Sequence, residues 1–266
     1  MVRRLLPLLP LALALAAPLA SATPQAQRVD DDPLPALSID DVTVTEGDSG
    51  TTSASFTVSL APASAESVSV DYATADDTAT APGDYESGSG TLVFAAGETT
   101  QTLSVMVNGD LLDEIDESYF VNLSNAVSAT IDDGQGLGTI NDDDPPPALS
   151  IDDVTVTEGD SGTTSATFTV GLNGASGQSV SVDYASADGT AQAPGDYQAT
   201  SGTLTFTPGQ TTRTLTVPVN GDTLDEATET YLVNLSNAVN ATIADGQGLG
   251  MITDDDPPPS LSVTSA

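Results

Sequence analysis

The chain has 266 residues, of which 39 are acidic and 4 are basic, and its formal net charge at pH 7 is −35. It contains no cysteine, histidine, tryptophan or lysine. This composition excludes disulfide bonds, zinc sites built on Cys or His, and catalytic triads that need those residues. It also argues against nucleic acids and anionic membranes as partners, because phosphate groups are bound by Lys and Arg.

The first 22 residues are typical of a secretory signal peptide. Arg3 and Arg4 precede an apolar stretch, and Ala20-Ser21-Ala22 matches an A-x-A cleavage site. Three prolines interrupt the apolar stretch, which favours a cleaved signal over a retained membrane helix. We therefore expect an exported protein that is secreted, held at the cell surface or periplasmic, with no membrane insertion of the mature chain. Residues 23–35 are predicted to form a flexible N-terminal segment.

The remainder of the sequence repeats itself. The string "ALSIDDVTVTEGDSG" begins at Ala36 and again at Ala148, an offset of 148 − 36 = 112 residues that continues without a gap. A period of this length is typical of a whole domain rather than of a solenoid unit. The predicted domains are residues 36–144 and 148–256, called the first and second repeat below.

The segments outside the repeats are short. The linker 145–147 consists of three prolines, which favour a stiff polyproline conformation. Residues 257–266 form a further linker followed by "SLSVTSA", which is similar to the start of a third, truncated repeat. The chain is therefore interpreted as a piece of a longer array or as two repeats with a short tail.

Each repeat is predicted to consist of short β-strands. Apolar side chains alternate with polar ones, as Phe56, Val58 and Leu60 do, and this period of two is typical of half-buried strands. The clearest strands of the first repeat lie at 54–60, 67–73, 90–94, 102–107 and 118–124. About seven strands in about 110 residues predict an immunoglobulin-like β-sandwich. The expected fold is all-β: two tandem immunoglobulin-like seven-stranded β-sandwiches joined by a short proline linker.

Acidic residues recur where these predicted strands end. In the first repeat they are Glu46 at the end of the first predicted strand, which precedes those listed, Asp84 in "APGDY", the loop 110–117 and the run 142–144. Alternate loops of a sandwich meet at the same end, so we expect these carboxylates to converge. Two unit charges about 4 Å apart repel by about 4 kcal/mol at an effective dielectric constant of 20. The few arginines cannot compensate them, whereas Ca²⁺ accepts six to eight oxygen ligands from flexible loops.

Four strings of the first repeat, "VTVTEGDSGTTSASFTV", "SVDYATADDTATAPGDY", "DLLDEIDESYFVNLSNA" and "IDDGQGLGTINDDD", resemble the Calx-beta domain. This family includes the regulatory calcium-binding domains of sodium/calcium exchangers and many bacterial surface proteins, and this chain is similar to the bacterial surface or secreted type. The resemblance covers both repeats and implies a sandwich with Ca²⁺ bound at one end. The metal ligands that it implies are Glu46, Asp84, Asp110, Glu114, Glu117, Asp143, Asp144, Glu158, Asp196, Asp222, Glu226, Glu229, Asp255 and Asp256.

One departure from the family pattern concerns the loop before the acidic segment. Exchanger domains have adjacent aspartates where this chain has Asn108-Gly109-Asp110 and Asn220-Gly221-Asp222. One carboxylate is thereby lost from each site, so we expect fewer or weaker ions than in the regulatory domains. For Asp142 and Asp254, ligation and a solvated linker remain open alternatives, and Asp84 and Asp196 have a turn-capping alternative.

The function that follows is an exported Ca²⁺-binding structural or adhesion module. Ca²⁺ at the ends of the sandwiches would rigidify a multidomain rod, and its partners would be calcium ions, other surface or matrix proteins, or further repeats of the same chain. The alternative is a Ca²⁺-independent acidic spacer of a surface protein. An enzyme is not expected, because the acids cluster with one another and few aromatic residues are present to hold a sugar.

Overall fold

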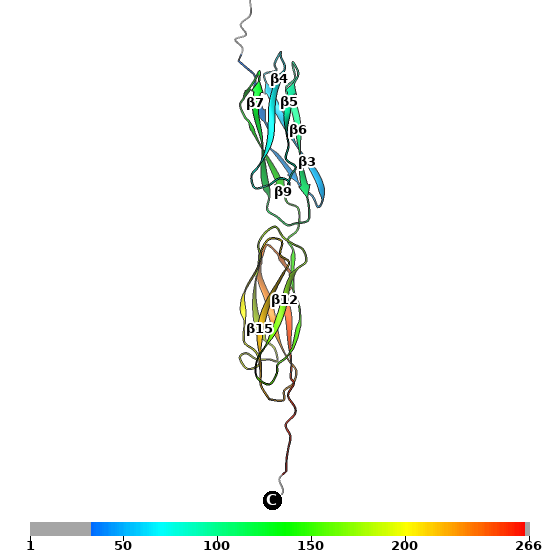
Figure 1. Ribbon diagram of the computed structural model, residues 1–266, viewed down its shortest axis with the longest axis vertical. Helices are drawn as coiled ribbons and strands as arrows, with labels where there is room; N and C mark the ends of the chain where they lie inside the picture. Colours follow the sequence, from blue (N-terminus) through cyan, green and yellow to red (C-terminus); the bar gives the residue numbers. More distant parts are fainter. Residues whose placement is uncertain (1–32, 264–266) are drawn as a thin grey trace, which may run out of the picture. The chain divides into compact units, whose positions relative to one another are not determined.

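The computed structural model describes residues 33–263. The predicted signal peptide and nearly all of the segment 23–35 lie outside the described residues. The described part consists of two repeats built from β-strands and loops (Figure 1). Within residues 33–263 there is no helix with the length and apolar character needed to cross a membrane.

Nine strands form the first repeat. They are β1 (Ala36–Ile39), β2 (Val42–Thr45), β3 (Gly50–Ala61), β4 (Val68–Asp76), β5 (Ser89–Phe94), β6 (Thr100–Gly109), β7 (Glu117–Val127), β8 (Thr130–Ile131) and β9 (Gln135–Asn141). One sheet has the order β6-β3-β1-β8 and the other the order β2-β9-β7-β4-β5. The predicted all-β sandwich is therefore confirmed.

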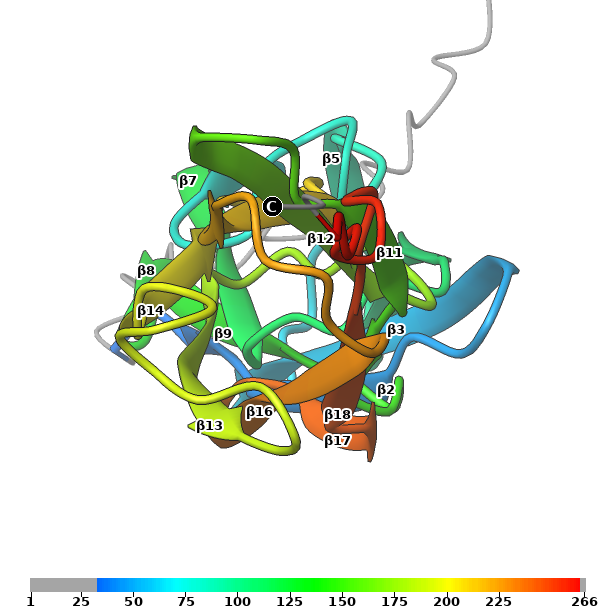
Figure 2. The same ribbon diagram turned by 90° about the horizontal axis from the view of Figure 1, so that it is seen from below.

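The second repeat has the same topology. Its strands are β10 (Ala148–Ile151), β11 (Val154–Thr157), β12 (Gly162–Leu172), β13 (Val180–Asp188), β14 (Ser201–Phe206), β15 (Thr212–Gly221), β16 (Glu229–Val239), β17 (Thr242–Asp245) and β18 (Gln247–Thr253). The sheets have the orders β15-β12-β10-β17 and β11-β18-β16-β13-β14. Figure 2 views the ribbon from below, with the strands of both repeats drawn over one another.

The first predicted strand is divided between the two sheets. β1 pairs with β3 and β8, whereas β2 pairs in parallel with β9. At the division, Asp40 Oδ1 accepts a hydrogen bond from Thr57 N at 2.6 Å, and Asp41 Oδ1 accepts one from Leu137 N at 2.8 Å. These side chains replace backbone partners where the chain crosses, and the crossing explains part of the difference between nine strands and the expected seven.

Alternating side chains fill the core between the sheets. Phe56 and Val58 are fully buried, as the period of two predicts. The rings of Tyr85 and Tyr119 stack with centroids 4.5 Å apart, and Phe56 meets Tyr119 edge-on at 6.1 Å. Gly138 lies against the Tyr119 ring so closely that a Cβ there would overlap it. The same aromatic cluster recurs in the second repeat.

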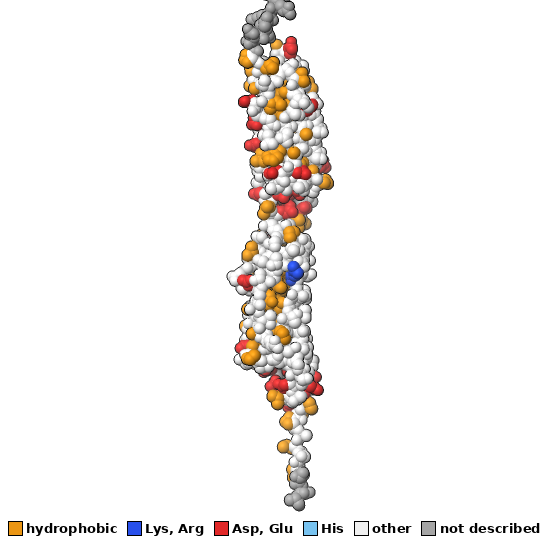
Figure 3. Space-filling model, turned by 60° about the vertical axis from the view of Figure 1, so that its left-hand side comes forward, with side chains coloured by type: hydrophobic (Ala, Val, Ile, Leu, Met, Phe, Trp, Pro, Cys, Tyr) orange, Lys and Arg blue, Asp and Glu red, His pale blue; other side chains and the backbone are white. Residues whose placement is uncertain are grey.

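Strand ends bring four acidic segments of the first repeat to one pole. Glu46 N, just after β2, donates to Asn141 O at the end of β9, at 3.2 Å. The register pairs Gly50 at the start of β3 with Gly109 at the end of β6. A Cβ on Gly109 would overlap the carbonyl oxygen of Gly47, so the two connections pack backbone against backbone. Figure 3 shows acidic side chains gathered at this end of the repeat.

Candidate metal centre

Two groups of three carboxylates form the acidic pole of the first repeat. Glu46, Asp142 and Asp144 each offer an oxygen within 4.8 Å of the others. Glu46 follows β2, and the two aspartates follow β9, so residues about a hundred positions apart meet here. Glu46 and Asp144 are buried, with 7% and 8% of their surface exposed. We call this group the inner trio.

The second group, the outer trio, comprises Asp84, Glu114 and Glu117, again with oxygens within 4.8 Å of one another. Asp84 lies between β4 and β5, Glu114 lies between β6 and β7, and Glu117 begins β7. The side chain of Asp84 is held by the backbone, because its Oδ2 accepts a hydrogen bond from Thr80 N at 2.6 Å. The turn-capping alternative and membership of a carboxylate cluster therefore coexist at this residue.

Asn108 has a positioning role that the sequence analysis missed. Its Nδ2 donates to the carbonyl oxygens of Pro82 and Gly83, at 2.9 and 2.8 Å. These contacts hold the turn that presents Asp84. A carboxylate at position 108 would have no hydrogen to donate to them. The departure from the family pattern thus exchanges an acidic side chain for a clamp on the neighbouring turn.

The second repeat contains the same two groups. Glu158, Asp254 and Asp256 form its inner trio, and Asp196, Glu226 and Glu229 form its outer trio. Asn220 again donates to two carbonyl oxygens of the turn before Asp196, those of Pro194 and Gly195, at 2.9 and 2.7 Å.

Electrostatic repulsion within each pole opposes ionisation. Burial, followed by the charges of Asp110 and Asp142, raises the pKa of Glu46 to about 8. Burial and the charge of Asp84 raise the pKa of Glu117 to about 7. In the second repeat, burial and Asp222 raise the pKa of Glu158 to about 7. At neutral pH these carboxylates resist losing their protons unless a positive charge joins them.

Several carboxylate oxygens of the inner trios have no hydrogen-bond partner among the described residues although they are buried. They are Asp142 Oδ1, Asp144 Oδ2 and Asp256 Oδ2. A buried, unpaired oxygen is costly, and a cation is a partner that would also neutralise it. The donors of both trios are all carboxylate oxygens, which suit a hard cation such as Ca²⁺. The residues present therefore fit the metal that the sequence predicted.

The aspartates of the terminal run do not all point to the same place. Asp142 and Asp144 belong to the inner trio, whereas Asp143 Oδ1 accepts a hydrogen bond from Gly47 N at 3.0 Å. The second repeat repeats this division, with Asp255 bonded to Gly159 N at 3.0 Å. In both repeats the structure places in the trio the first aspartate of the run, which the sequence left open.

Asp110 and Asp222 also lie outside the trios. Both are exposed, and each accepts a hydrogen bond at 2.7 Å from a backbone amide two residues later, that of Leu112 or Leu224. Asp110 nevertheless contributes to the negative field at Glu46. The remaining predicted ligands, in both repeats, are members of a trio.

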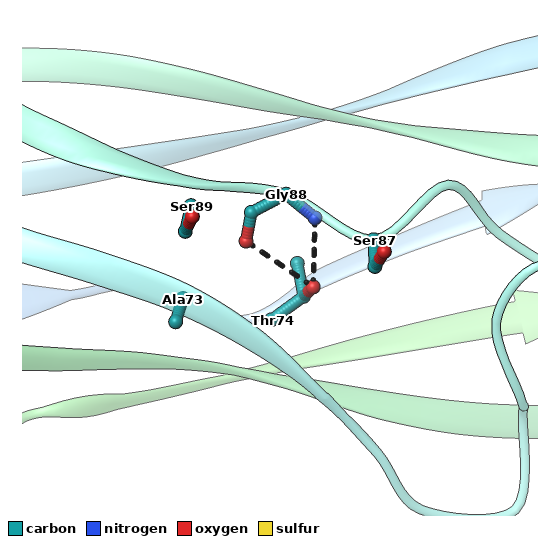
Figure 4. A pocket seen from close by; sticks show the side chains of 5 residues that line it. All are labelled: Ala73, Thr74, Ser87, Gly88 and Ser89. Atoms are coloured by element: carbon teal, nitrogen blue, oxygen red, sulfur yellow. Dashed lines mark hydrogen bonds between the residues drawn. The ribbon is translucent and has the colours of Figure 1, made fainter.

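A shallow hollow elsewhere on the first repeat has a different character. It is lined by Ala73, Thr74, Ser87, Gly88 and Ser89 (Figure 4). The Thr74 hydroxyl accepts a hydrogen bond from Gly88 N at 2.9 Å and donates one to Gly88 O at 3.3 Å. No carboxylate lines the hollow, in contrast to the acidic pole.

Comparison with known proteins identifies one family across both repeats. The model of the Calx-beta domain matches residues 30–144 and 141–256. Sodium/calcium exchanger 2 of Rattus norvegicus is 32% identical over 187 residues, covering 62% of this chain and 20% of the exchanger. Sodium/calcium exchanger 1 of the same species is 31% identical over 188 residues, covering 63% and 19%. This chain therefore spans about a fifth of the length of these relatives.

Two solved structures are similar at lower identity. The crystal structure of CBD12 from CALX1.2 is 18% identical with a TM-score of 0.40, covering 81% of this chain and 98% of that one. The crystal structure of the calcium binding domain CBD12 of CALX1.1 is 21% identical with a TM-score of 0.39, covering 76% and 79%.

Proposed function

The chain belongs to the Calx-beta domain family, and from that premise we propose that each repeat binds Ca²⁺ at its acidic pole. The observation that supports this most directly is the inner trio of the first repeat. Glu46 and Asp144 are more than nine-tenths buried there, and Asp144 Oδ2 has no partner among the described residues. Bound Ca²⁺ would supply the positive charge that these side chains lack.

The role that fits this chemistry is structural. Glu46, Asp84 and Glu114 come from three separate connections, and Asp144 directly precedes the prolines of the linker. Shared ligation would fix these segments to one another and to the start of the linker. Together with the signal-peptide-like start, this supports an exported structural or adhesion module of a surface or matrix protein. Extracellular modules of this kind bind Ca²⁺ with Kd values of about 10⁻⁴ to 10⁻³ M.

The proposal assigns no catalysis and no transport to the chain. The exchangers that it resembles are transporters, but the matched region is about a fifth of their length. The competing function is a Ca²⁺-independent acidic spacer, which the exposed and backbone-bonded side chains of Asp110 and Asp143 would serve equally well.

Calorimetric titration of the mature two-repeat protein with Ca²⁺ distinguishes the two functions. At a concentration tenfold above Kd, each site should add about 1.4 kcal/mol to the free energy of unfolding, and the melting temperature should rise by several degrees. NaCl at matched ionic strength is the control for simple screening. No heat and no change in melting temperature would leave the spacer as the function.

A pair of matched variants tests whether the sites are independent. Glu114→Gln should weaken Ca²⁺ binding in the first repeat alone, and Glu226→Gln should do so in the second alone. Equal loss in both repeats from either substitution would contradict a separate site at each pole.

A further inference from the structure

We infer that the loop Ser176–Gln178 is a docking element for the acidic loop of a preceding repeat, and that the equivalent loop 64–66 of the first repeat is built to reject such a loop. The inference goes beyond the proposed function, because the contacts involve protein atoms alone. The partner of the Ser176–Gln178 loop is an acidic loop between two strands of the preceding repeat, such as the loop that contains Asp113 and Glu114.

Asp113 is the centre of the contact. It lies between β6 and β7 of the first repeat and is only 5% exposed. Its Oδ2 accepts a hydrogen bond from Ser176 Oγ at 2.9 Å, and its carbonyl oxygen accepts bonds from Ser176 Oγ at 3.1 Å and Gly177 N at 3.0 Å. Gln178 Nε2 donates to the carbonyl oxygen of Glu114 at 3.3 Å and lies 3.5 Å from Asp113 Oδ2.

The equivalent loops of the two repeats share the same internal hydrogen bonds. Gln178 N donates to Ser176 Oγ at 3.0 Å, as Glu66 N does to Ser64 Oγ. Gly209 N donates to Ser176 O at 2.9 Å, and Gly97 N donates to Ser64 O at 2.8 Å. The loop fold therefore does not require the two residues at which the sequences differ, Gly177 in place of Ala65 and Gln178 in place of Glu66.

Gly177 is required by the contact rather than by its own backbone. Its φ is not in the left-handed region, and Ala65 occupies the corresponding place in the first repeat. A Cβ on Gly177 would lie 2.5 Å from Glu114 Oε1 and 2.7 Å from Glu114 Cγ. An alanine at 177 would therefore displace a side chain of the outer trio or separate the two loops.

The side chain at position 178 determines whether the contact is electrostatically favourable. The Gln178 amide can donate to the two acceptors that face it, whereas a glutamate there has no hydrogen to donate and adds a negative charge beside Asp113 and Glu114. The first repeat has Glu66 at this position. Gly and Gln thus suit contact with a preceding acidic loop, and Ala and Glu do not.

The same rule specifies the partner of the second repeat. Asp225 corresponds to Asp113 and is exposed, whereas Asp113 is buried. The loop that contains Asp225 fits a downstream repeat with a glycine and a glutamine at the positions equivalent to Gly177 and Gln178. It does not fit the 64–66 loop of a second copy of this chain, because Glu66 would face Asp225 and Glu226.

The test is amide hydrogen exchange by NMR on the full chain in EDTA, with the amide of residue 177 as the reporter. Because this amide donates to Asp113 O, we expect protection in the wild type and exchange at least about tenfold faster in Gly177→Ala and Gln178→Glu. Gln178→Ala should have a smaller effect than Gln178→Glu, and about 0.5 M NaCl should reverse part of the effect of Gln178→Glu alone.

Two controls separate docking from folding. The Gly209 amide, bonded within the second repeat, should stay protected in all variants, and Glu66→Gln should leave the amide of residue 177 unchanged. An unprotected amide at 177 in the wild type would overturn the inference, as would equal effects of Gln178→Glu and Gln178→Ala. Because EDTA is present throughout, a failure of Ca²⁺ binding would not alter either outcome.

Discussion

Glu46→Gln should stabilise the Ca²⁺-free protein and reduce the further stabilisation that Ca²⁺ provides. The pKa of Glu46 is raised from 4.5 to about 8, chiefly by burial and then by neighbouring aspartates. At pH 7 this difference corresponds to at most about 3 kcal/mol of lost folding free energy. The pole is partly open to water, so screening reduces the expected gain from a neutral amide to about 1.5 kcal/mol. For a repeat of this size the melting temperature should rise by about 6 °C.

With Ca²⁺ the advantage of the variant should shrink, because the variant lacks one anionic ligand of the inner trio. If binding weakens by about tenfold, a Ca²⁺ concentration tenfold above the wild-type Kd adds about 1.4 kcal/mol to the wild type but only about 0.4 kcal/mol to the variant. Scanning calorimetry in EDTA and in Ca²⁺ measures both effects, and Glu158→Gln is the matched variant in the second repeat. A lower melting temperature of Glu46→Gln in EDTA would refute the reasoning, because it would show that the carboxylate stabilises the metal-free pole.

Three further outcomes follow from the same structure. In EDTA the free energy of unfolding should fall as pH rises from about 4.5 to about 8. The reason is that the raised pKa values of Glu46, Glu117 and Glu158 let the folded state hold more protons than the unfolded state in this window. Denaturant titrations at several pH values should measure this slope, and the slope should vanish with Ca²⁺. Tyr119→Phe should leave the free energy of unfolding unchanged or raise it slightly, because the buried Tyr119 hydroxyl has no partner among the described residues. Tyr85→Phe should lower it by about 1.5 kcal/mol in urea unfolding, because the 2.6 Å hydrogen bond to Asp76 is lost. Gly109→Ala should lower the free energy of unfolding by about 2 kcal/mol or more, because its Cβ would overlap a backbone carbonyl. Gly88→Ala is the control, and with open space around its Cβ position it should stay within about 0.5 kcal/mol of the wild type. Equal costs of the two substitutions would contradict the close approach of the two backbones at Gly109.

Most of the fold was predictable because each repeat has a local and repetitive pattern. The alternation of Phe56, Val58 and Leu60 fixes which face of β3 is buried, and the 112-residue offset fixes where the second repeat starts. The division of the first strand was not predicted, because "SIDDVTV" reads as one extended segment. Only the partners of Asp40 and Asp41, which lie far along the chain, show that the strand changes sheets there.

The candidate site was predictable by region but not by residue. Conventional sandwich topology places the acidic connections together, whereas the direction of each side chain depends on local geometry. The run 142–144 directly follows β9, and its alternate side chains point to different partners, as they would in a strand. Asp142 and Asp144 therefore join Glu46, and Asp143 turns to Gly47 N. The period of two, applied beyond the strand end, could have identified this pair.

The role of Asn108 could not be found in the same way. Its function depends on the carbonyl oxygens of a turn some 25 residues earlier, and no periodicity relates the two segments. A comparison of residue types suggests only that a carboxylate is missing. The three-dimensional contact shows what replaces it, a pair of hydrogen bonds that position Asp84.

The distribution of hydrogen bonds indicates how metal binding and folding are related. Backbone donors hold Asp84 and Asp143, and the aromatic core around Tyr119 lies between the sheets. The loops of the pole are therefore positioned by the fold itself, and what remains unfavourable is the charge of the two trios. We therefore expect a cation to add to the stability of a folded domain, unlike the metal of a zinc finger, which is required for folding. Ca²⁺ should thus raise the melting temperature gradually with its concentration, with the strand content unchanged in EDTA.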